Sequence, residues 1–340
     1  MTSSFSPAWW LPESHSQTLW PRFFRPRLPL PTVTETWDTP DGDEIDVVRL
    51  SAPPGAPRVL VIHGLEGSSR SHYAVGLFDQ ARRRAWGADL LLFRTCNGRL
   101  NRARRSYHSG DTEDLDLAVQ RIQDEHPDSP LGLVGVSLGA NVLIKWLGEQ
   151  RDRVGPRVRG AVAVSTPFDL ARSSRRIGRG LSRLYQWHFL RSLRAKALAK
   201  IERFPDVASP GAISGARTLW EFDEVFTAVL HGFRDAADYY AQSSSIGFLS
   251  SIRVPTLLLS ARDDPFHAPE VLDEVASIAA GNACLTTEFP ARGGHVGFIE
   301  GWVPWRARYY AEERIGTWLA ARLCGEVRQR PHSEAGAWSQ

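Results

Sequence analysis

The sequence has few cysteines and lacks long apolar runs. Its three cysteines, Cys96, Cys284 and Cys324, lie far apart and form no Cys-x-x-Cys pair. This pattern argues against a disulfide framework or a zinc site and favours reduced thiols in the cytoplasm. No apolar stretch is long enough to cross a bilayer, and the N-terminal segment lacks the basic and apolar regions of a signal peptide. We therefore predict a cytoplasmic protein.

The composition is that of an ordinary globular protein, with 42% hydrophobic and 23% charged residues among 340. A chain of this length can form one large α/β domain with an insertion. Its net charge of +3 is unevenly distributed, because residues 171–203 carry ten Arg or Lys and one acid, Glu202. The rest of the chain is net acidic and contains no recognisable nucleic-acid-binding module. We therefore expect no nucleic-acid partner.

Short apolar runs alternate with amphipathic helical segments along most of the chain. The predicted strands comprise residues 32–39, 45–50, 58–62, 88–93, 131–136, 158–164, 254–259 and 284–289. A last helix is predicted near Pro304 to Leu323. Such alternation of buried strands and helices is typical of a doubly wound, mostly parallel sheet with helices on both faces.

The pattern also divides the chain into segments. Residues 1–32 are rich in Trp, Phe and Pro and are predicted to pack on the domain as an N-terminal arm. Residues 33–325 form the predicted α/β domain, in which the alternation stops at about 167–245. That segment is predicted to be a helical cap insertion. Residues 326–340 are polar and are predicted to be a disordered tail.

Ser137 lies in Gly135-Val136-Ser137-Leu138-Gly139, between a predicted strand and a predicted helix. A turn this tight holds the serine in a strained conformation, and the glycines let neighbouring backbone pass without a Cβ clash. Gly-x-Ser-x-Gly at a strand-to-helix junction is the nucleophile elbow of the α/β-hydrolase fold. The sequence therefore predicts this fold, with Ser137 as the nucleophile. Epoxide hydrolases and dehalogenases need an aspartate here and are excluded.

A serine hydroxyl needs a base, and the base needs a carboxylate that orients it. In this fold the acid and the base follow the last strands. His295 follows the run 284–289 in a glycine-rich loop, so we predict it as general base and then general acid. Asp263 and Asp264 follow the run 254–259. We favour Asp264 as the orienting acid, with Asp263 as the alternative that bonds the loop backbone.

The oxyanion of an acyl-transfer intermediate needs two preorganised N–H donors. We predict the backbone N–H of Leu138, directly after the nucleophile, and that of Leu65, in the loop that follows the strand ending before His63. His63 is expected to be a structural hydrogen-bonding residue, because His295 already supplies the base. His108 is left with two interpretations, a pocket-lining residue or a residue that holds its loop in place.

Six motifs together resemble the YheT-like branch of the α/β-hydrolases. They are HGLEGSS (63–69), YHSGDTEDL (107–115), GVSLGAN (135–141), TLWEFDEVFTAVLHGF (218–233), DDPF (263–266) and GGHVGF (293–298). The match begins near His15-Ser16-Gln17-Thr18 and covers nearly the whole chain. It implies the triad Ser137, Asp264 and His295. Ala140 stands where the branch usually has a second glycine, which leaves the triad untouched.

The branch includes bacterial esterases and eukaryotic acylglycerol lipases, phospholipases and medium-chain ester synthases, so the resemblance implies a reaction class better than a substrate. We predict hydrolysis of short- to medium-chain acyl esters or acylglycerol-like lipids through an acyl-enzyme, with no metal or organic cofactor. Acyl transfer to an alcohol is the first alternative. A non-catalytic binding protein of the same fold is the second, although such a protein would not need a triad and two oxyanion loops.

The basic segment has two interpretations. Apolar residues recur at helical spacing between Leu181 and Ile201, with arginines off that stripe. A basic amphipathic helix can lie on an anionic membrane surface, which would suit an enzyme that takes acyl chains from lipid. The other interpretation, which we favour, is a cap helix that packs its apolar stripe over the pocket while its arginines face water.

Overall fold

The computed structural model describes residues 4–26 and 28–325, so the predicted tail at 326–340 lies outside the described residues. Its centre is an eight-stranded sheet with the strand order β1-β2-β4-β3-β5-β6-β7-β8. The strands are β1 (Thr32–Asp38), β2 (Glu44–Leu50), β3 (Arg58–Ile62), β4 (Gly87–Leu92), β5 (Leu131–Val136), β6 (Val158–Val164), β7 (Thr256–Leu259) and β8 (Leu285–Glu288). Each lies within about two residues of its predicted range.

The sheet is parallel except at β2, which pairs antiparallel with both β1 and β4. The pairs from β4 through β3, β5, β6 and β7 to β8 are all parallel. Strands β3, β4 and β5 are buried along their whole length, which explains their continuous apolar sequences. The prediction of a doubly wound, mostly parallel sheet is therefore confirmed.

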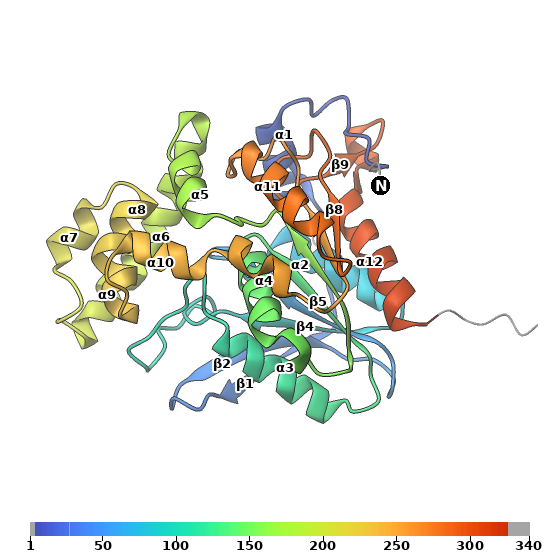
Figure 1. Ribbon diagram of the computed structural model, residues 1–340, viewed down its shortest axis with the longest axis horizontal. Coiled ribbons are helices and arrows are strands. Elements are labelled where there is room, and N and C mark those ends of the chain that lie inside the picture. Colours follow the sequence, from blue (N-terminus) through green and yellow to red (C-terminus); the bar gives the residue numbers. More distant parts are fainter. Residues whose placement is uncertain (1–3, 27, 326–340) are drawn as a thin grey trace, which may run out of the picture.

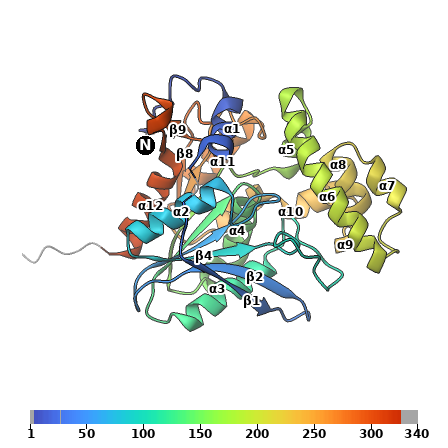
Figure 2. The ribbon, with the colours of Figure 1, turned by 180° about the vertical axis from the view of Figure 1, so that it is seen from behind.

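Helices cover both faces of the sheet (Figures 1 and 2). One face carries α3 (Glu113–Glu125), α4 (Leu138–Gln150) and α11 (Pro269–Ala280), and the other carries α2 (His72–Arg83) and α12 (Tyr310–Leu323). Each face has its own core of buried side chains. The sheet is thereby held between two apolar layers, and the loops at its carboxyl edge are left to form a site.

Strand β3 lies at the switch point of the sheet, with β4 on one side and β5 on the other. The chain leaves β3 through α2 towards β4, and it later returns to the other side of β3 as β5. Ligand sites of open α/β sheets lie outside the carboxyl ends of the strands at such a point. The loop that begins with His63 and the turn at Ser137 follow these two neighbouring strands.

The chain between β6 and β7 forms the helical insertion, a name used here for residues Leu170–Ser243 (Figure 1). Its elements are α5 (Leu170–Ile177), η2 (Gly180–Ser182), α6 (Arg183–Arg203), α7 (Pro210–Gly215), α8 (Leu219–Phe222), the π-helical turn η3 (Asp223–Thr227), α9 (Ala228–His231) and α10 (Ala236–Ser243). The insertion has a small apolar core of its own, which includes Leu190, Ile213 and Phe226. The 3-10 turns η1 (Arg151–Arg153) and η4 (Ser245–Ser251) lie outside it.

The N-terminal segment packs against the chain around β9 and β10 at one edge of the molecule. Helix α1 (Ser14–Phe24) follows an extended segment whose Ala8 N–H donates to the carbonyl of Ile299 at 2.9 Å. Strands β9 (Ile299–Glu300) and β10 (Arg308–Tyr309) pair antiparallel, with the 3-10 turn η5 (Pro304–Arg306) between them. The predicted last helix near 304–323 was therefore too long. Residues before Tyr310 are used in this hairpin instead.

Among residues 4–26 and 28–325, no helix combines the length and the apolar character that a membrane span requires.

Candidate active site

Ser137 occupies a strained turn between β5 and α4. Its φ of +55° lies in the left-handed region, which residues other than glycine rarely adopt. The turn also packs tightly, because a Cβ on Gly139 would collide with the carbonyl oxygens of Ile62 and His63. Helix α4 begins at Leu138, directly after the serine. The serine thereby stands at the N-terminus of a helix, at the carboxyl edge of the sheet.

The structure brings Ser137, His295 and Asp264 into one hydrogen-bonded chain. The Oγ of Ser137 lies 2.9 Å from Nε2 of His295, and Nδ1 of His295 lies 2.8 Å from Oδ2 of Asp264. Because an ionised carboxylate can only accept, Nδ1 carries the proton and Nε2 is free to accept the serine hydroxyl proton. The ring of Phe266 packs on the imidazole, with centroids 4.2 Å apart.

The two neighbouring aspartates point to different partners. Asp264 is buried and also accepts the Phe266 N–H at 2.8 Å. Burial alone would raise the pKa of Asp264, but the charges of His267 and His295 and the hydrogen bonds lower it below its ordinary value. Asp263 instead accepts the backbone N–H of Gly294 at 2.9 Å. In this geometry Asp264 orients the imidazole and Asp263 orients the loop that carries it.

Helix α1 holds the loop of His295 in place. Thr18 Oγ1 accepts the backbone N–H of His295 at 2.9 Å, and Gln17 Oε1 accepts that of Ile299 at 2.7 Å. The loop passes so close to α1 that a Cβ on Gly294 would collide with the carbonyl of Ser14. The motif at residues 15–18 does not reveal this role in the sequence, because its partner lies about 280 residues away in the chain.

His267 is a second imidazole beside the acid that sequence reasoning missed. Its Nε2–H donates to the carbonyl of Ser165 at 2.8 Å and lies 3.4 Å from Oδ2 of Asp264. Burial lowers its pKa. Asp264, His267 and His295 are also the one group of metal-ligating side chains that lies together within the described residues. Their nitrogen and oxygen atoms are engaged with one another and with Ser165, so the group is better explained as a hydrogen-bonded cluster.

The two predicted oxyanion donors lie beside the serine. Leu65 and Leu138 line the same cavity as Ser137. Within the described part of the chain, neither backbone N–H donates to a protein acceptor. The loop of Leu65 lies against the elbow, since a Cβ on Gly64 would stand 3.0 Å from the Cβ of Ser137. Both N–H groups are therefore free to bind a ligand oxygen.

His63 fixes the loop of Leu65 through hydrogen bonds to backbone groups. Its Nε2 accepts the Phe93 N–H at 3.1 Å, so the proton lies on Nδ1, which donates to the carbonyl of Gly64 at 2.7 Å. Burial lowers the pKa of His63 to about 4, which keeps the imidazole neutral. A neutral imidazole with both nitrogens bonded to backbone cannot serve as a second base.

Ser137 opens into a cavity of about 160 Å³ between the sheet and the helical insertion. Its apolar lining includes Leu170, Phe189, Leu193, Phe222, Phe226 and Leu230. A cavity of roughly 150 Å³ takes up benzene, so this one matches a guest of about six carbon atoms. The insertion contributes most of the apolar wall, whereas the sheet domain contributes the reactive groups.

Polar groups interrupt the apolar lining on the insertion side. Asp223, on the π-helical turn η3, accepts hydrogen bonds from Tyr240 and Thr227, each 2.6 Å long. Burial raises the pKa of Asp223 to about 6. His108 and His231 face each other with centroids 4.5 Å apart, and burial lowers both pKa values. His108 also accepts the Gly110 N–H, so it both lines the cavity and fixes its own loop.

The motif at residues 218–233 predicts no chemistry by itself. The structure shows why: Asp223 and His231 meet Tyr240 and His108 only after the insertion folds over the sheet. A π-helical turn, which is rare and is often found at functional sites, carries Asp223. The available signal was weak: three acids and one histidine, His231, in a segment rich in apolar and aromatic residues.

Comparisons with known proteins agree with this geometry. Residues 57–301 match the family model described as alpha/beta hydrolase fold. The chain is 37% identical to "Putative esterase YheT" of Escherichia coli, over 95% of this chain and 94% of that protein. It is 27% identical to "Phospholipase ABHD3" of Mus musculus, over 91% of this chain and 76% of that protein.

Solved structures give the same result for the fold. The esterase Pf2001 of Pyrococcus furiosus superposes with a TM-score of 0.57 at 17% identity, covering 86% of this chain and 94% of that one. A likeness at this identity shows a shared fold alone. The family match and the 37% identity go further: the chain is a hydrolase and belongs to the YheT-like branch of the α/β-hydrolase family.

Proposed function

We propose that the protein is a serine esterase that cleaves carboxylic esters with short- to medium-chain acyl groups through an acyl-enzyme. The hydrogen-bonded chain from Ser137 through His295 to Asp264 carries this proposal, because it ends in a cavity beside two unbonded backbone N–H groups. Two relatives named for esterase and phospholipase activity support an ester as substrate.

Acylation begins when Nε2 of His295 accepts the hydroxyl proton of Ser137 and Oγ forms a bond to the carbonyl carbon of the ester. The negative charge that develops on the carbonyl oxygen is stabilised by the N–H groups of Leu65 and Leu138. Asp264 keeps the imidazole in the right orientation and stabilises its positive charge. The C–O bond to the alcohol then breaks as His295 returns the proton to the leaving oxygen.

Deacylation repeats the sequence with water. His295 accepts a proton from water, the hydroxide oxygen bonds to the acyl carbon, and the same two N–H groups hold the oxyanion. The bond to Oγ of Ser137 breaks, and His295 gives its proton back to that oxygen. The products are a carboxylic acid and the alcohol, and the enzyme is regenerated without a redox partner.

The apolar wall of the cavity supports an acyl group as the buried part of the substrate. Phe189, Leu193 and Phe226 would remove a hydrocarbon chain from water, which stabilises the complex by about 0.8 kcal/mol per buried CH2. The helical insertion acts in this proposal as the cap over the acyl chain. The cavity volume favours chains of about four to eight carbons over palmitate.

The test is turnover of p-nitrophenyl esters from acetate to palmitate by purified protein. We expect a peak at one short or medium chain length, and a loss of about three orders of magnitude or more in kcat in Ser137→Ala. Ser250→Ala replaces an exposed serine on η4 and should keep full activity. A fluorophosphonate probe should label the wild type and Ser250→Ala but not Ser137→Ala.

Other outcomes would replace the proposal. Wild-type protein that neither turns over any ester nor reacts with the probe would be a binding protein. With ethanol added, an acyltransferase would form more ethyl ester than the relative concentrations of ethanol and water predict by mass action. Faster turnover of charged, water-soluble esters than of butyrate-to-decanoate esters would contradict the assignment of the apolar cavity to the acyl chain.

A further inference from the structure

Exposed aromatic side chains lie on four segments that contact one another: the N-terminal segment, α1, the loop between β9 and β10, and α6. In the described part of the chain, six Phe or Trp residues are exposed, and we call them the aromatic face: Trp9, Phe23, Phe24, Trp187, Trp302 and Trp305. Trp302 is 85% and Trp305 80% exposed, which is rare for so large an apolar side chain. Scattered apolar residues need no explanation, but six clustered aromatics indicate a partner.

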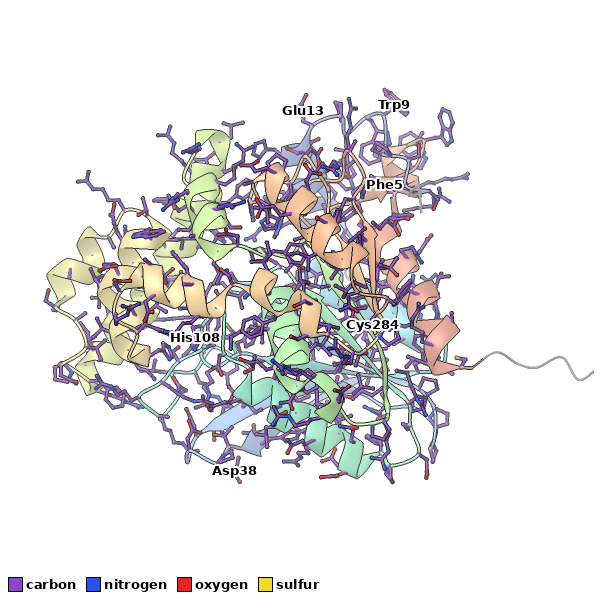
Figure 3. All side chains as sticks on the ribbon, in the orientation of Figure 1. Phe5, Trp9, Glu13, Asp38, His108 and Cys284 are labelled. Carbon is purple, nitrogen blue, oxygen red and sulfur yellow. The ribbon has the colours of Figure 1, made fainter. Side chains whose placement is uncertain are left out.

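Contacts connect the segments that carry these residues. The indole of Trp9 donates to the carbonyl of Trp302 at 2.9 Å. Trp10 packs against Trp20, with centroids 4.6 Å apart, and Trp20 stacks on Phe24 at 4.3 Å. The N-terminal segment, α1 and the loop between β9 and β10 therefore form one continuous part of the face. Figures 1 and 2 place α1 and β9 at the same end of the molecule, and Figure 3 shows Trp9 at that edge.

Helix α6 extends this surface to the helical insertion. Arg22 of α1 lies 3.3 Å from Nε2 of His188 on α6, and His15 stacks on Tyr185. Leu184, Trp187 and His188 share one side of α6 by their spacing, and all three are exposed. The other side of α6 lines the substrate cavity through Phe189 and Leu193. Helix α6 thus contributes one side to the aromatic face and the other side to the cavity.

The charge around the aromatic face is positive. Five exposed arginines lie on its elements or directly beside them: Arg22, Arg179, Arg183, Arg191 and Arg306. None of the five forms an ion pair with a carboxylate of the described residues. Glu13, at the start of α1, is an exposed acid on the same side. Exposed Trp and Phe with unpaired arginines suit the interface of a bilayer with anionic lipids, where indole rings lie among the headgroups and arginines attract phosphate.

We propose that the aromatic face docks on an anionic phospholipid bilayer, with its Trp and Phe side chains in the headgroup region. The face differs from a whole basic amphipathic helix lying on the membrane, the interpretation of α6 that the sequence did not favour, because the apolar stripe of α6 becomes buried towards its C-terminal end, at Ala197 and Ile201. In the docked state, the side of α6 that faces away from the cavity contacts the lipid. The proposal is independent of the esterase mechanism, since binding to vesicles needs no turnover.

The test is co-sedimentation with sucrose-loaded vesicles of phosphatidylcholine alone or with one quarter phosphatidylglycerol. We expect binding to the anionic vesicles that weakens as salt is added. Trp302→Ser combined with Trp305→Ser should lower the partition constant about tenfold or more. Arg191→Gln combined with Arg306→Gln should reduce the preference for phosphatidylglycerol and the salt dependence.

Matched controls distinguish binding through the aromatic face from nonspecific binding through other exposed apolar residues. Val33→Ser combined with Val229→Ser removes two exposed apolar residues from β1 and α9, outside the face, and should bind vesicles like the wild type. Turnover of a water-soluble p-nitrophenyl ester should be unchanged in the Trp302/Trp305 variant, which shows that it is folded. Equal binding by wild type and this variant, or no binding to anionic vesicles, would overturn the proposal. So would a dimer, seen by light scattering, that the same variant dissociates.

Discussion

Lys196 of α6 donates to the carboxylate of Glu66 at 2.7 Å, and this ion pair joins the helical insertion to the loop that carries Leu65. Glu66 follows Leu65 directly and has a φ of +55°, so its backbone is strained where the loop must be placed accurately. Ser192 of α6 and Tyr107 also donate to this carboxylate. The position of the Leu65 N–H therefore depends on contacts made by the insertion.

We predict that breaking this pair lowers kcat more than it changes KM. Lys196→Met leaves the Glu66 carboxylate without its cation, and Glu66→Gln weakens the same contact. A misplaced oxyanion donor acts mainly in the transition state, so we expect a loss of about tenfold or more in kcat. Steady-state kinetics on the best p-nitrophenyl ester measures both constants.

The control is a second ion pair that also links the sheet domain to the insertion. Arg104 and Asp206 pair at the surface, away from the oxyanion loop, and both side chains are exposed. Arg104→Met should leave kcat within about twofold, because exposed ion pairs contribute little. A similar loss of kcat in Arg104→Met and Lys196→Met would mean that both ion pairs act only by attaching the helical insertion to the sheet domain.

Thr18 is predicted to position His295 through the backbone of its loop. Thr18→Val keeps the shape of the side chain but removes the oxygen that accepts the His295 N–H. We expect kcat/KM to fall about tenfold and fluorophosphonate labelling to slow in parallel. Ser16→Ala is the control in the same helix, because the Ser16 hydroxyl donates only to the carbonyl of Glu13. Unchanged kinetics in Thr18→Val would assign α1 no part in the catalytic geometry.

The side chains of α6 should set the preferred acyl length. Leu193→Ala enlarges the cavity and should move the optimum towards longer chains by about two carbons, whereas Ala197→Leu fills it and should move the optimum the other way. Ala195→Leu changes an exposed position of the same helix and should leave the profile unchanged. Chain-length profiles that stay the same in all three variants would place the acyl group elsewhere.

Asp223 should make stability depend on pH. Burial raises the pKa of Asp223 in the folded protein from 3.8 to about 6. The stabilisation of the folded protein by the protonated Asp223 carboxyl is therefore fully present below about pH 4 and is lost as the pH rises through 6. By pH 7, ionisation of Asp223 lowers the free energy of unfolding by about 3 kcal/mol. The Tm of Asp223→Asn minus that of the wild type should therefore increase between pH 4 and 7. The exposed Asp128→Asn should show a flat difference.

Much of the fold could be predicted because its signals are local. Buried parallel strands need continuous apolar runs, and these runs stand in the sequence within about two residues of the observed strands. The elbow is likewise a property of a few adjacent residues, since a strained serine requires glycine nearby. Ser137 and Leu138 could be singled out for this reason. The error at residues 304–309 arose because a hairpin with Ile299–Glu300 competes there with helix propensity.

The sequence favoured Asp264 over Asp263 but left Asp263 open as the orienting acid. Both lie in one turn with equal chemistry, and only the path of the His295 loop decides which one meets Nδ1. Thr18 and Glu66 lie in motifs, but their roles could not be read from sequence, because each meets its partner from a segment more than 100 residues away. The role of Asp223 depended on how the insertion folds around Tyr240.

The sequence by itself determined the sheet, the elbow and the order of the reactive side chains, because backbone strain and apolar patterning act within a few residues. The tertiary structure decided which carboxylate faces the imidazole, how the insertion ties down the oxyanion loop and where the aromatic face lies. Those features depend on packing between distant segments, whose directions a one-dimensional pattern does not encode.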